Sequence, residues 1–339
     1  MGPSVNEQRQ ALAAAEATGL EKLGPCPPHL DETWIEIPVS NNQTNKTKVV
    51  WPKPSEKQQQ LQCPLVIYYH GGGLSVGSPD SVLAPARAFA TLFCCVVACP
   101  SLNQLPELPF PEPVENAWEV CAWLSDVRNL NDGVLKDAGT VVDPTLGFVV
   151  GGLSAGGATA AVVGAISGAS LAGVKEFAGL TPLKNTITGI FSGIPFLATE
   201  AMLPPRYRDM LKSREENSDT VGDAMRKELE SYLSVHSHWF SPLNLDISNP
   251  MTVQHHPPKV FIYGGQLDPF RDDSIIYAKW LEQLSGVQVR AVMLEGEGHN
   301  AWVTAPFPAS HTRDIKVPTI DGMAWLLGTE WDREQELPY

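Results

Sequence analysis

The chain has 339 residues, of which 43% are hydrophobic and 18% charged, and its formal net charge at pH 7 is −14. This length can bury a large core, and the acidic balance argues against nucleic acid or an anionic membrane as partner, because basic patches bind both. No apolar run reaches the length of a membrane span, and residues 1–20 lack the apolar core of a signal peptide. The composition predicts a soluble, cytoplasmic protein.

The cysteines and histidines give no pattern of a metal or disulfide site. The six cysteines are Cys26, Cys63, Cys94, Cys95, Cys99 and Cys121. Neither their spacing nor the inferred compartment suggests a disulfide framework, so we expect buried free thiols. The histidines that could suggest a metal site are His236, His238, His255 and His256. No carboxylate or cysteine pattern completes such a site, and we therefore expect no metal.

Apolar runs and helical periodicities alternate along most of the chain. Before residue 195 we expect helices within residues 1–33 and a strand hairpin at 34–39 and 46–51. Over the same part of the chain we expect strands at 65–69, 94–99, 146–150 and 187–194, and helices at 79–92, 114–124 and 158–166. Residues 195–258, here called the insertion, interrupt this alternation with a charged helix at 212–233. After the insertion we expect strands at 259–263 and 287–294 and helices at 276–284 and 322–327.

This alternation predicts an α/β fold with a mostly parallel central sheet flanked by helices. In such sheets the functional loops follow the carboxyl ends of the strands. We divide the chain into an N-terminal cap segment (residues 1–33), the first part of the core (34–194), a cap insertion (195–258) and the second part of the core (259–339).

A Gly-x-Ser-x-Gly motif at residues 152–156 lies between the apolar run 146–150 and a helix rich in small residues. A nucleophile elbow needs this pattern, because strand and helix approach so closely that side chains at Gly152 and Gly156 would collide. Ser154 at its tip is then an exposed candidate nucleophile next to a helix N-terminus. A turn without chemistry is the alternative for this motif alone.

A second motif, His-Gly-Gly-Gly at residues 70–73, follows the buried strand 65–69. Glycines let backbone N–H groups approach a substrate oxygen closely. We expect the N–H groups of Gly72, Gly73 and Ala155 to form an oxyanion hole. A flexible glycine turn is the alternative, but the two motifs occur together, in order, and both after buried strands.

A serine nucleophile needs a base and an acid that orients the base, and in this class of fold the chain order is serine, acid, histidine. His299 follows the strand 287–294 in a glycine-containing loop, whereas His311 follows no strand. Asp268 directly follows the strand 259–263. We therefore expect Ser154, Asp268 and His299 to form the catalytic triad.

Other acidic residues near these positions fit the triad less well. Asp272 and Asp273 lie near a helix start, where capping or an interaction with the helix dipole explains them better. Glu295 and Glu297 precede His299 on the same loop, which does not match the expected order.

With these motifs the sequence resembles the hormone-sensitive-lipase-like carboxylesterases of the α/β-hydrolase fold over about residues 60–330. The resemblance rests on the motifs at 70–73 and 152–157, on Gly77-Ser78 and Pro109-Phe110-Pro111, and on Asp268-Pro269 and Gly298-His299. It implies a helical cap over an acyl pocket and no cofactor. Leu153 stands where the family usually has an acidic residue, and residues 100–103 replace a stretch containing Tyr-Arg; neither change removes a catalytic group.

The sequence thus predicts a serine carboxylesterase that cleaves small to medium esters through an acyl-enzyme, acting on a small molecule as a monomer or homodimer. An acyltransferase or lactonase would use the same triad. A ligand receptor on a hydrolase scaffold, resembling the gibberellin receptors, would lack the catalytic histidine, whereas His299 is present.

Large apolar residues of the two cap segments are further candidates for the site. We expect some of them to form an apolar acyl or alcohol pocket over Ser154. The candidate substrate-binding residues are Leu74, Phe196, Leu203 and Trp239. The alternative for each cap residue is that it only packs the insertion onto the sheet.

Overall fold

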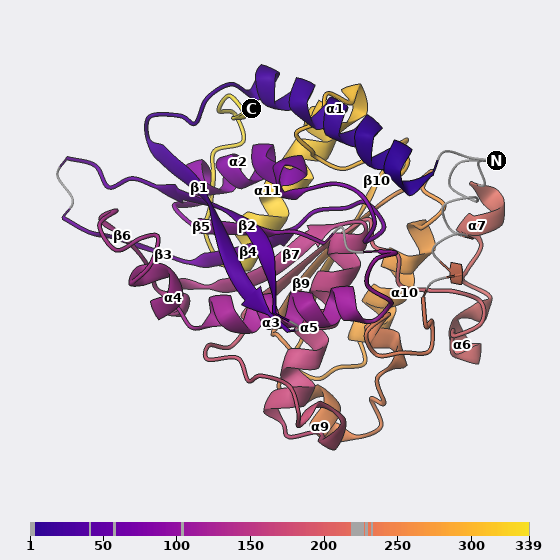
Figure 1. Ribbon diagram of the computed structural model, residues 1–339. Coiled ribbons are helices and arrows are strands. Elements are labelled where there is room, and N and C mark those ends of the chain that lie inside the picture. The colour runs from indigo at the N-terminus through magenta and orange to yellow at the C-terminus, as the bar shows by residue number, and fades with distance from the viewer. Residues whose placement is uncertain are drawn as a thin grey trace.

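The computed structural model describes residues 4–40, 42–56, 59–102, 105–217, 227, 230–231 and 233–338. Its centre is an eight-stranded sheet with the order β1-β2-β5-β4-β7-β8-β9-β10 (Figure 1). The strands are β1 (Leu30–Val39), β2 (Gln43–Pro52), β4 (Leu65–Tyr69), β5 (Val96–Pro100), β7 (Phe148–Leu153), β8 (Gly189–Gly193), β9 (Lys259–Gly265) and β10 (Gln288–Leu294). Strand β2 is antiparallel to β1 and β5, and the other pairings are parallel. The predicted α/β class with a mostly parallel sheet is confirmed.

Helices cover both faces of the sheet, because its central strands are apolar on both sides. In β4, Val66 and Tyr68 belong to the core under α2 (Leu83–Phe93) and α11 (Arg313–Leu327). The alternate residues Leu65, Ile67 and Tyr69 belong to the core on the other face. That face is covered by α3 (Glu112–Ser125), α5 (Ala155–Leu171) and α10 (Arg271–Leu281) (Figure 1).

The parallel register brings the ends of four strands to one edge of the sheet. Tyr69 of β4 pairs with Gly152 of β7, and Leu294 of β10 pairs with Gly265 of β9. The loops that follow these strands carry the two glycine motifs and the predicted acid and base, so all of them start at the same edge.

The insertion, residues 195–258, connects β8 to β9. Its described helices are α6 (Pro205–Arg208), α7 (Ser213–Glu216) and α9 (Pro250–Val253). The helix predicted at 212–233 corresponds in its first turn to α7, and most of the remainder lies outside the described residues. Helix α1 (Val5–Leu23) runs across one end of the molecule (Figure 1).

Several predicted boundaries were wrong. The last helix begins at Arg313, not at residue 322, and carries Pro318 in its interior. Strand β5 begins at Val96, because Cys94 ends α2 in a left-handed conformation with φ 48°. Three further elements were not predicted: the paired short strands β3 (Leu61–Cys63) and β6 (Thr140–Val142), and the four-residue helix α4 (Arg128–Asn131).

The cysteines are all free, but only four of the six are buried. Cys94 is exposed and Cys26 is half-buried, which corrects the expectation of buried thiols for these two residues. Within the described residues, no three His, Cys, Asp or Glu side chains come together in a way that could hold a metal ion. Over the same residues, no helix has the length and apolarity to cross a membrane.

Candidate active site

Ser154 sits at the tip of a sharp turn between β7 and α5. Its φ of 54° and ψ of −119° are a strained conformation for a residue with a side chain. The turn is possible because residues 152 and 156 are glycines without a Cβ atom. A Cβ atom at Gly152 would lie 2.5 Å from the carbonyl carbon of Gly156, and one at Gly156 would lie 2.3 Å from the carbonyl oxygen of Tyr69. The local backbone therefore has the form of a nucleophile elbow.

The structure brings together the three residues predicted from their chain order. Nε2 of His299 lies 2.9 Å from Oγ of Ser154, and Nδ1 lies 2.8 Å from Oδ2 of Asp268. Asp268 is fully buried, whereas the His299 side chain is about a quarter exposed. The second carboxylate oxygen of Asp268 accepts a hydrogen bond of 2.7 Å from the backbone N–H of Phe270. This arrangement can transfer the serine proton to the imidazole and stabilise the imidazolium that forms.

The alternative histidine and acids lie elsewhere. Nε2 of His311 is 2.8 Å from the carbonyl oxygen of Ala305. Glu297 accepts a hydrogen bond from the side chain of Asn300. Asp272 and Asp273 lie in the first turn of α10 but do not cap it; their carboxylates accept hydrogen bonds from backbone N–H groups of the insertion. The capping alternative was therefore wrong, because tertiary contacts satisfy these two carboxylates, whereas their place in the first turn fits the alternative of an interaction with the helix dipole.

The glycine motif after β4 forms a tight loop beside Ser154. Gly72 and Gly73 have φ values of +109° and +61°, which favour glycine. A Cβ atom at Gly72 would lie 2.2 Å from the carbonyl oxygen of Val76. Gly72→Ala would therefore keep the backbone N–H but force the loop to shift, because the added methyl group has no room. The next residue, Leu74, also has a positive φ of 62°, so the backbone strain continues beyond the glycines.

His70 fixes the start of this loop from inside the protein. It is fully buried; its Nδ1 lies 2.6 Å from the carbonyl oxygen of Gly71, and its Nε2 accepts a hydrogen bond of 2.9 Å from the backbone N–H of Leu102. Burial lowers the pKa of His70 to about 4. The ring is therefore neutral at neutral pH and can accept and donate one hydrogen bond each.

We expect the folded state to lose stability as the pH falls from 7 to 5. Burial also lowers the pKa of His256 to about 4. The unfolded chain, with a histidine pKa near 6.5, binds more protons in this interval, so protonation favours unfolding by roughly 2 kcal/mol for each histidine. Urea unfolding at pH 7, 6 and 5 measures this effect. In His256→Gln, whose amide does not titrate, about half of the pH dependence should vanish; the same dependence in both proteins would contradict the assignment.

Comparisons with known proteins agree with the geometry of the site. A family model described as an alpha/beta hydrolase fold matches residues 66–303. The chain belongs to this family. This α/β-hydrolase is 30% identical over 253 residues to Carboxylesterase NlhH of Mycobacterium tuberculosis, covering 71% of the chain and 66% of the relative. It is 26% identical to an AB hydrolase superfamily protein of Schizosaccharomyces pombe, covering 91% of the chain and 83% of that protein.

Solved structures agree on the fold. The crystal structure of vibralactone cyclase superposes with a TM-score of 0.77 at 22% identity, covering 96% of this chain and 90% of the other. Together with the carboxylesterase relative, the family match confirms the resemblance predicted from the two glycine motifs, and it supports the prediction of a carboxylic ester hydrolase.

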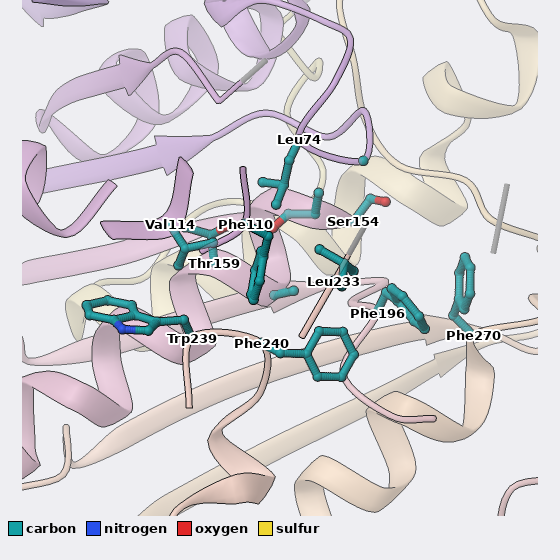
Figure 2. A pocket seen from close by; sticks show the side chains of 13 residues that line it. Leu74, Phe110, Val114, Ser154, Thr159, Phe196, Leu233, Trp239, Phe240 and Phe270 are labelled. Atoms are coloured by element: carbon teal, nitrogen blue, oxygen red, sulfur yellow. Dashed lines mark hydrogen bonds between the residues drawn. The ribbon is translucent and has the colours of Figure 1, made fainter. Parts of the chain in front are cut away.

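A mainly apolar pocket of this α/β-hydrolase opens at Ser154 (Figure 2). The empty space of this pocket, including its open mouth, is about 540 Å³. The pocket is lined by Gly73, Leu74, Phe110, Val114, Ser154, Ala155, Ala158, Thr159, Phe196, Leu233, Trp239, Phe240 and Phe270. Figure 2 shows Trp239 at the end of the pocket that is remote from Ser154. We call this cavity the aromatic pocket.

A second pocket meets the first at Ser154 and includes His299. It contains more polar groups, among them Asn300, Ser81 and Ser310, together with Phe307 on the loop before α11. Leu12 of α1 lines it as well. Ile194, another lining residue, has a positive φ of 42°. We call this cavity the histidine-side pocket.

Three of the four predicted substrate-binding residues, Leu74, Phe196 and Trp239, line the aromatic pocket. Leu203 does not; it is 2% exposed and packs within the hydrophobic core. The sequence analysis did not propose Phe110, Thr159, Leu233 or Phe270 as lining residues. Phe270 could have been suspected from its place two residues after Asp268, and Phe110 from the Pro109-Phe110-Pro111 motif, whereas Thr159 and Leu233 lie outside any motif.

Proposed function

We propose that this α/β-hydrolase is a serine carboxylesterase that acts through an acyl-enzyme. The observation that carries the proposal is the hydrogen-bonded series from Ser154 through His299 to the buried Asp268, with distances of 2.9 and 2.8 Å. The similarity to a carboxylesterase supports a carboxylic ester as substrate. The free cysteines are typical of a reducing compartment, which supports the cytoplasm as its location.

In the first half of the reaction, His299 Nε2 takes the proton of Ser154 as Oγ attacks the ester carbonyl carbon. Asp268 holds Nδ1–H and stabilises the imidazolium. The same proton then passes from Nε2 to the leaving alcohol oxygen, and the acyl group stays on Oγ. In the second half, His299 activates a water molecule that releases the carboxylic acid and restores the serine.

The negative charge that develops on the carbonyl oxygen needs hydrogen-bond donors next to Ser154. We assign this role to the backbone N–H groups of Gly72, Gly73 and Ala155. Ala155 is the first residue of α5, so the positive end of the helix dipole adds to its N–H. In the ground state these donors have little charge to stabilise, and their effect therefore falls mainly on kcat.

The position of His299 indicates which pocket holds the alcohol part of the ester and which holds the acyl part. Because His299 must protonate the leaving oxygen, the alcohol lies in the histidine-side pocket, and the acyl chain enters the aromatic pocket. Each cap segment contributes to one pocket: α1 supplies Leu12 to the histidine-side pocket, and the insertion supplies Phe196, Trp239 and Phe240 to the aromatic pocket. Residues 1–33 and 195–258 thus act as a cap over an enclosed site.

We expect Trp239→Ala to move the acyl-length optimum to longer esters, because it deepens the end of the aromatic pocket. Wild-type enzyme should show an optimum among soluble p-nitrophenyl esters with short or medium acyl chains and a steep fall for long ones. Phe307→Ala should leave this profile unchanged and alter the preference among acetates of different alcohols. The measurement is kcat/KM over both ester series for all three proteins.

Two outcomes would contradict this assignment. If Trp239→Ala changed the alcohol profile and Phe307→Ala changed the acyl profile, the two pockets would have the opposite roles. If wild-type rates rose sharply when the substrate formed an interface, or were equal from acetate to palmitate, the site would be that of a lipase with an exposed lid and not an enclosed pocket.

A further inference from the structure

The insertion contacts the loop that carries the proposed acid. Segment 212–217, which contains α7, lies against residues 266–273 and is here called the clamp. The clamp donates hydrogen bonds along the whole loop. The Asn217 side chain donates to the carbonyl oxygens of Gln266 and Asp268 at 3.0 and 3.2 Å, and Ser213 Oγ donates to the carbonyl oxygen of Pro269 at 2.8 Å. The backbone N–H groups of Lys212 and Ser213 donate to the carboxylate of Asp272, both at 2.6 Å. Figure 1 shows α7 beyond α10 at the edge of the molecule.

Arg214 is the central side chain of the clamp, and only 7% of it is exposed. Its guanidinium donates to the carbonyl oxygen of Pro269, to the carboxylate of Asp273 at 2.6 Å and to the carbonyl oxygen of Ala198 at 3.1 Å. Its central carbon lies 4.7 Å from the centre of the Phe270 ring. One buried guanidinium thus contacts the two residues that follow Asp268.

Both contacts bear on the orientation of the triad. The backbone N–H of Phe270 donates to Oδ1 of Asp268 at 2.7 Å, which leaves Oδ2 for His299. The Phe270 ring meets the His299 ring edge to face at 5.2 Å. A shift of residues 269–270 would therefore rotate the carboxylate of Asp268 and move the surface against which the imidazole packs.

Asp273 of α10 links the Arg214 guanidinium to the start of the insertion, residues 197–198. It is fully buried, and its other oxygen accepts hydrogen bonds of 2.7 and 2.8 Å from the backbone N–H groups of Leu197 and Ala198. A planar guanidinium can serve two carbonyl groups, a carboxylate and an aromatic face at once, whereas the ammonium of lysine cannot. The contacts of Arg214 are therefore specific to arginine.

We propose that Arg214 is a positioning residue for the Asp268–His299 pair, through which the insertion holds the acid loop in its active geometry. The inference rests on the proposed function for its kinetic part. It requires that a change at Arg214 alters the reaction at each active site, and not only the fraction of folded protein.

The test compares Arg214→Lys with wild type and with Arg87→Lys. Arg87 is a matched control, because it is also buried and pairs with Glu32 and the carbonyl oxygens of Gly24 and Pro25. It lies on α2, in the hydrophobic core on the opposite face of the sheet from α10. Both variants should lose some stability. Active sites are counted with a fluorophosphonate, so that rates refer to intact sites.

For Arg214→Lys we expect kcat per site to fall by about 10- to 100-fold with little change in KM, since small misplacement of a catalytic group costs this much. The acid limb of the pH–rate profile should move to lower pH, because a less well-placed Asp268 stabilises the imidazolium less. Arg87→Lys should keep the wild-type kcat per site and pH profile. Unchanged kcat per site in Arg214→Lys would overturn the proposal. A change in KM alone would also overturn it, because Arg214 would then only support the residues that line the pocket.

A second readout does not depend on the substrate. In wild type the Nδ1 proton of His299, held by Asp268, should give a low-field proton resonance that is lost in Asp268→Asn. In Arg214→Lys this resonance should shift and exchange faster, and in Arg87→Lys it should not. An unchanged resonance overturns the positioning role. If the resonance changes as expected in Arg214→Lys but the wild-type protein hydrolyses no ester, the proposed function is overturned and the positioning role stays in place.

Discussion

Ser154→Ala is expected to lower ester turnover by about 10⁴- to 10⁶-fold, the cost of removing a triad member. The substitution deletes only Oγ, which lies 2.9 Å from His299 Nε2. Alanine keeps the Cβ atom, so the strained elbow carries the same strain in both proteins and the thermal unfolding temperature should change by a few degrees at most. Initial rates with a short p-nitrophenyl ester, together with a thermal unfolding curve, measure both effects.

The control for this variant is Ser170→Ala, which removes a hydroxyl near the other end of the same helix, α5. It should keep wild-type turnover. Intact-mass spectra after mixing with substrate provide the decisive check, because wild type can carry the mass of the acyl group and Ser154→Ala cannot. An acylated Ser154→Ala protein would show that another residue is the nucleophile.

The elements around Ser154 could be predicted from the sequence because their signals are local. The elbow needs small residues at Gly152 and Gly156 for steric reasons that act within a few residues. Buried strands such as β4 and β7 are continuous apolar runs, and the parallel arrangement then brings their carboxyl ends to one edge. Chain order together with the position after a predicted strand selected His299 and Asp268, which the fold brings within hydrogen-bond distance.

Features that depend on tertiary contacts could not be predicted in the same way. Leu203 and Phe196 belong to the same insertion and to the same hydrophobic core, yet only Phe196 also lines the aromatic pocket. Which of the two side chains reaches the pocket depends on the path of the chain between them. The role of Asp272 and Asp273 was hidden for the same reason, since their partners lie about 60 to 75 residues earlier in the chain.

The acceptor of the acyl group is not encoded in any motif either. Water, an alcohol and an internal hydroxyl all attack the acyl-enzyme with help from the same His299. The difference between hydrolysis and acyl transfer lies in which acceptor fits the histidine-side pocket. Its mixed lining, with Asn300 and Ser310 beside Phe307, admits water, which is consistent with the proposed hydrolysis.

Asp268→Asn is expected to lower kcat by about 10⁴-fold, as in the best-studied serine protease case. The reason can be followed in this site atom by atom. Phe270 N–H donates to Oδ1, so the carbonyl oxygen of an asparagine would stay there. Its NH₂ group would then face Nδ1 of His299 in place of Oδ2. Nδ1 would have to accept a hydrogen bond, and the proton of the neutral ring would move to Nε2, which could no longer take the proton of Ser154.

The measurement combines kinetics with the tautomer itself. Nitrogen chemical shifts of His299 should report a protonated Nδ1 in wild type and a protonated Nε2 in Asp268→Asn. Asp321→Asn is the control, since Asp321 lies on α11, pairs with Arg333 beyond the end of that helix, and should affect neither the rate nor the tautomer. Near-normal turnover in Asp268→Asn would contradict the assignment of the acid. A large rate loss with an unchanged tautomer would mean that Asp268 acts through its charge on the imidazolium and not by fixing the ring proton.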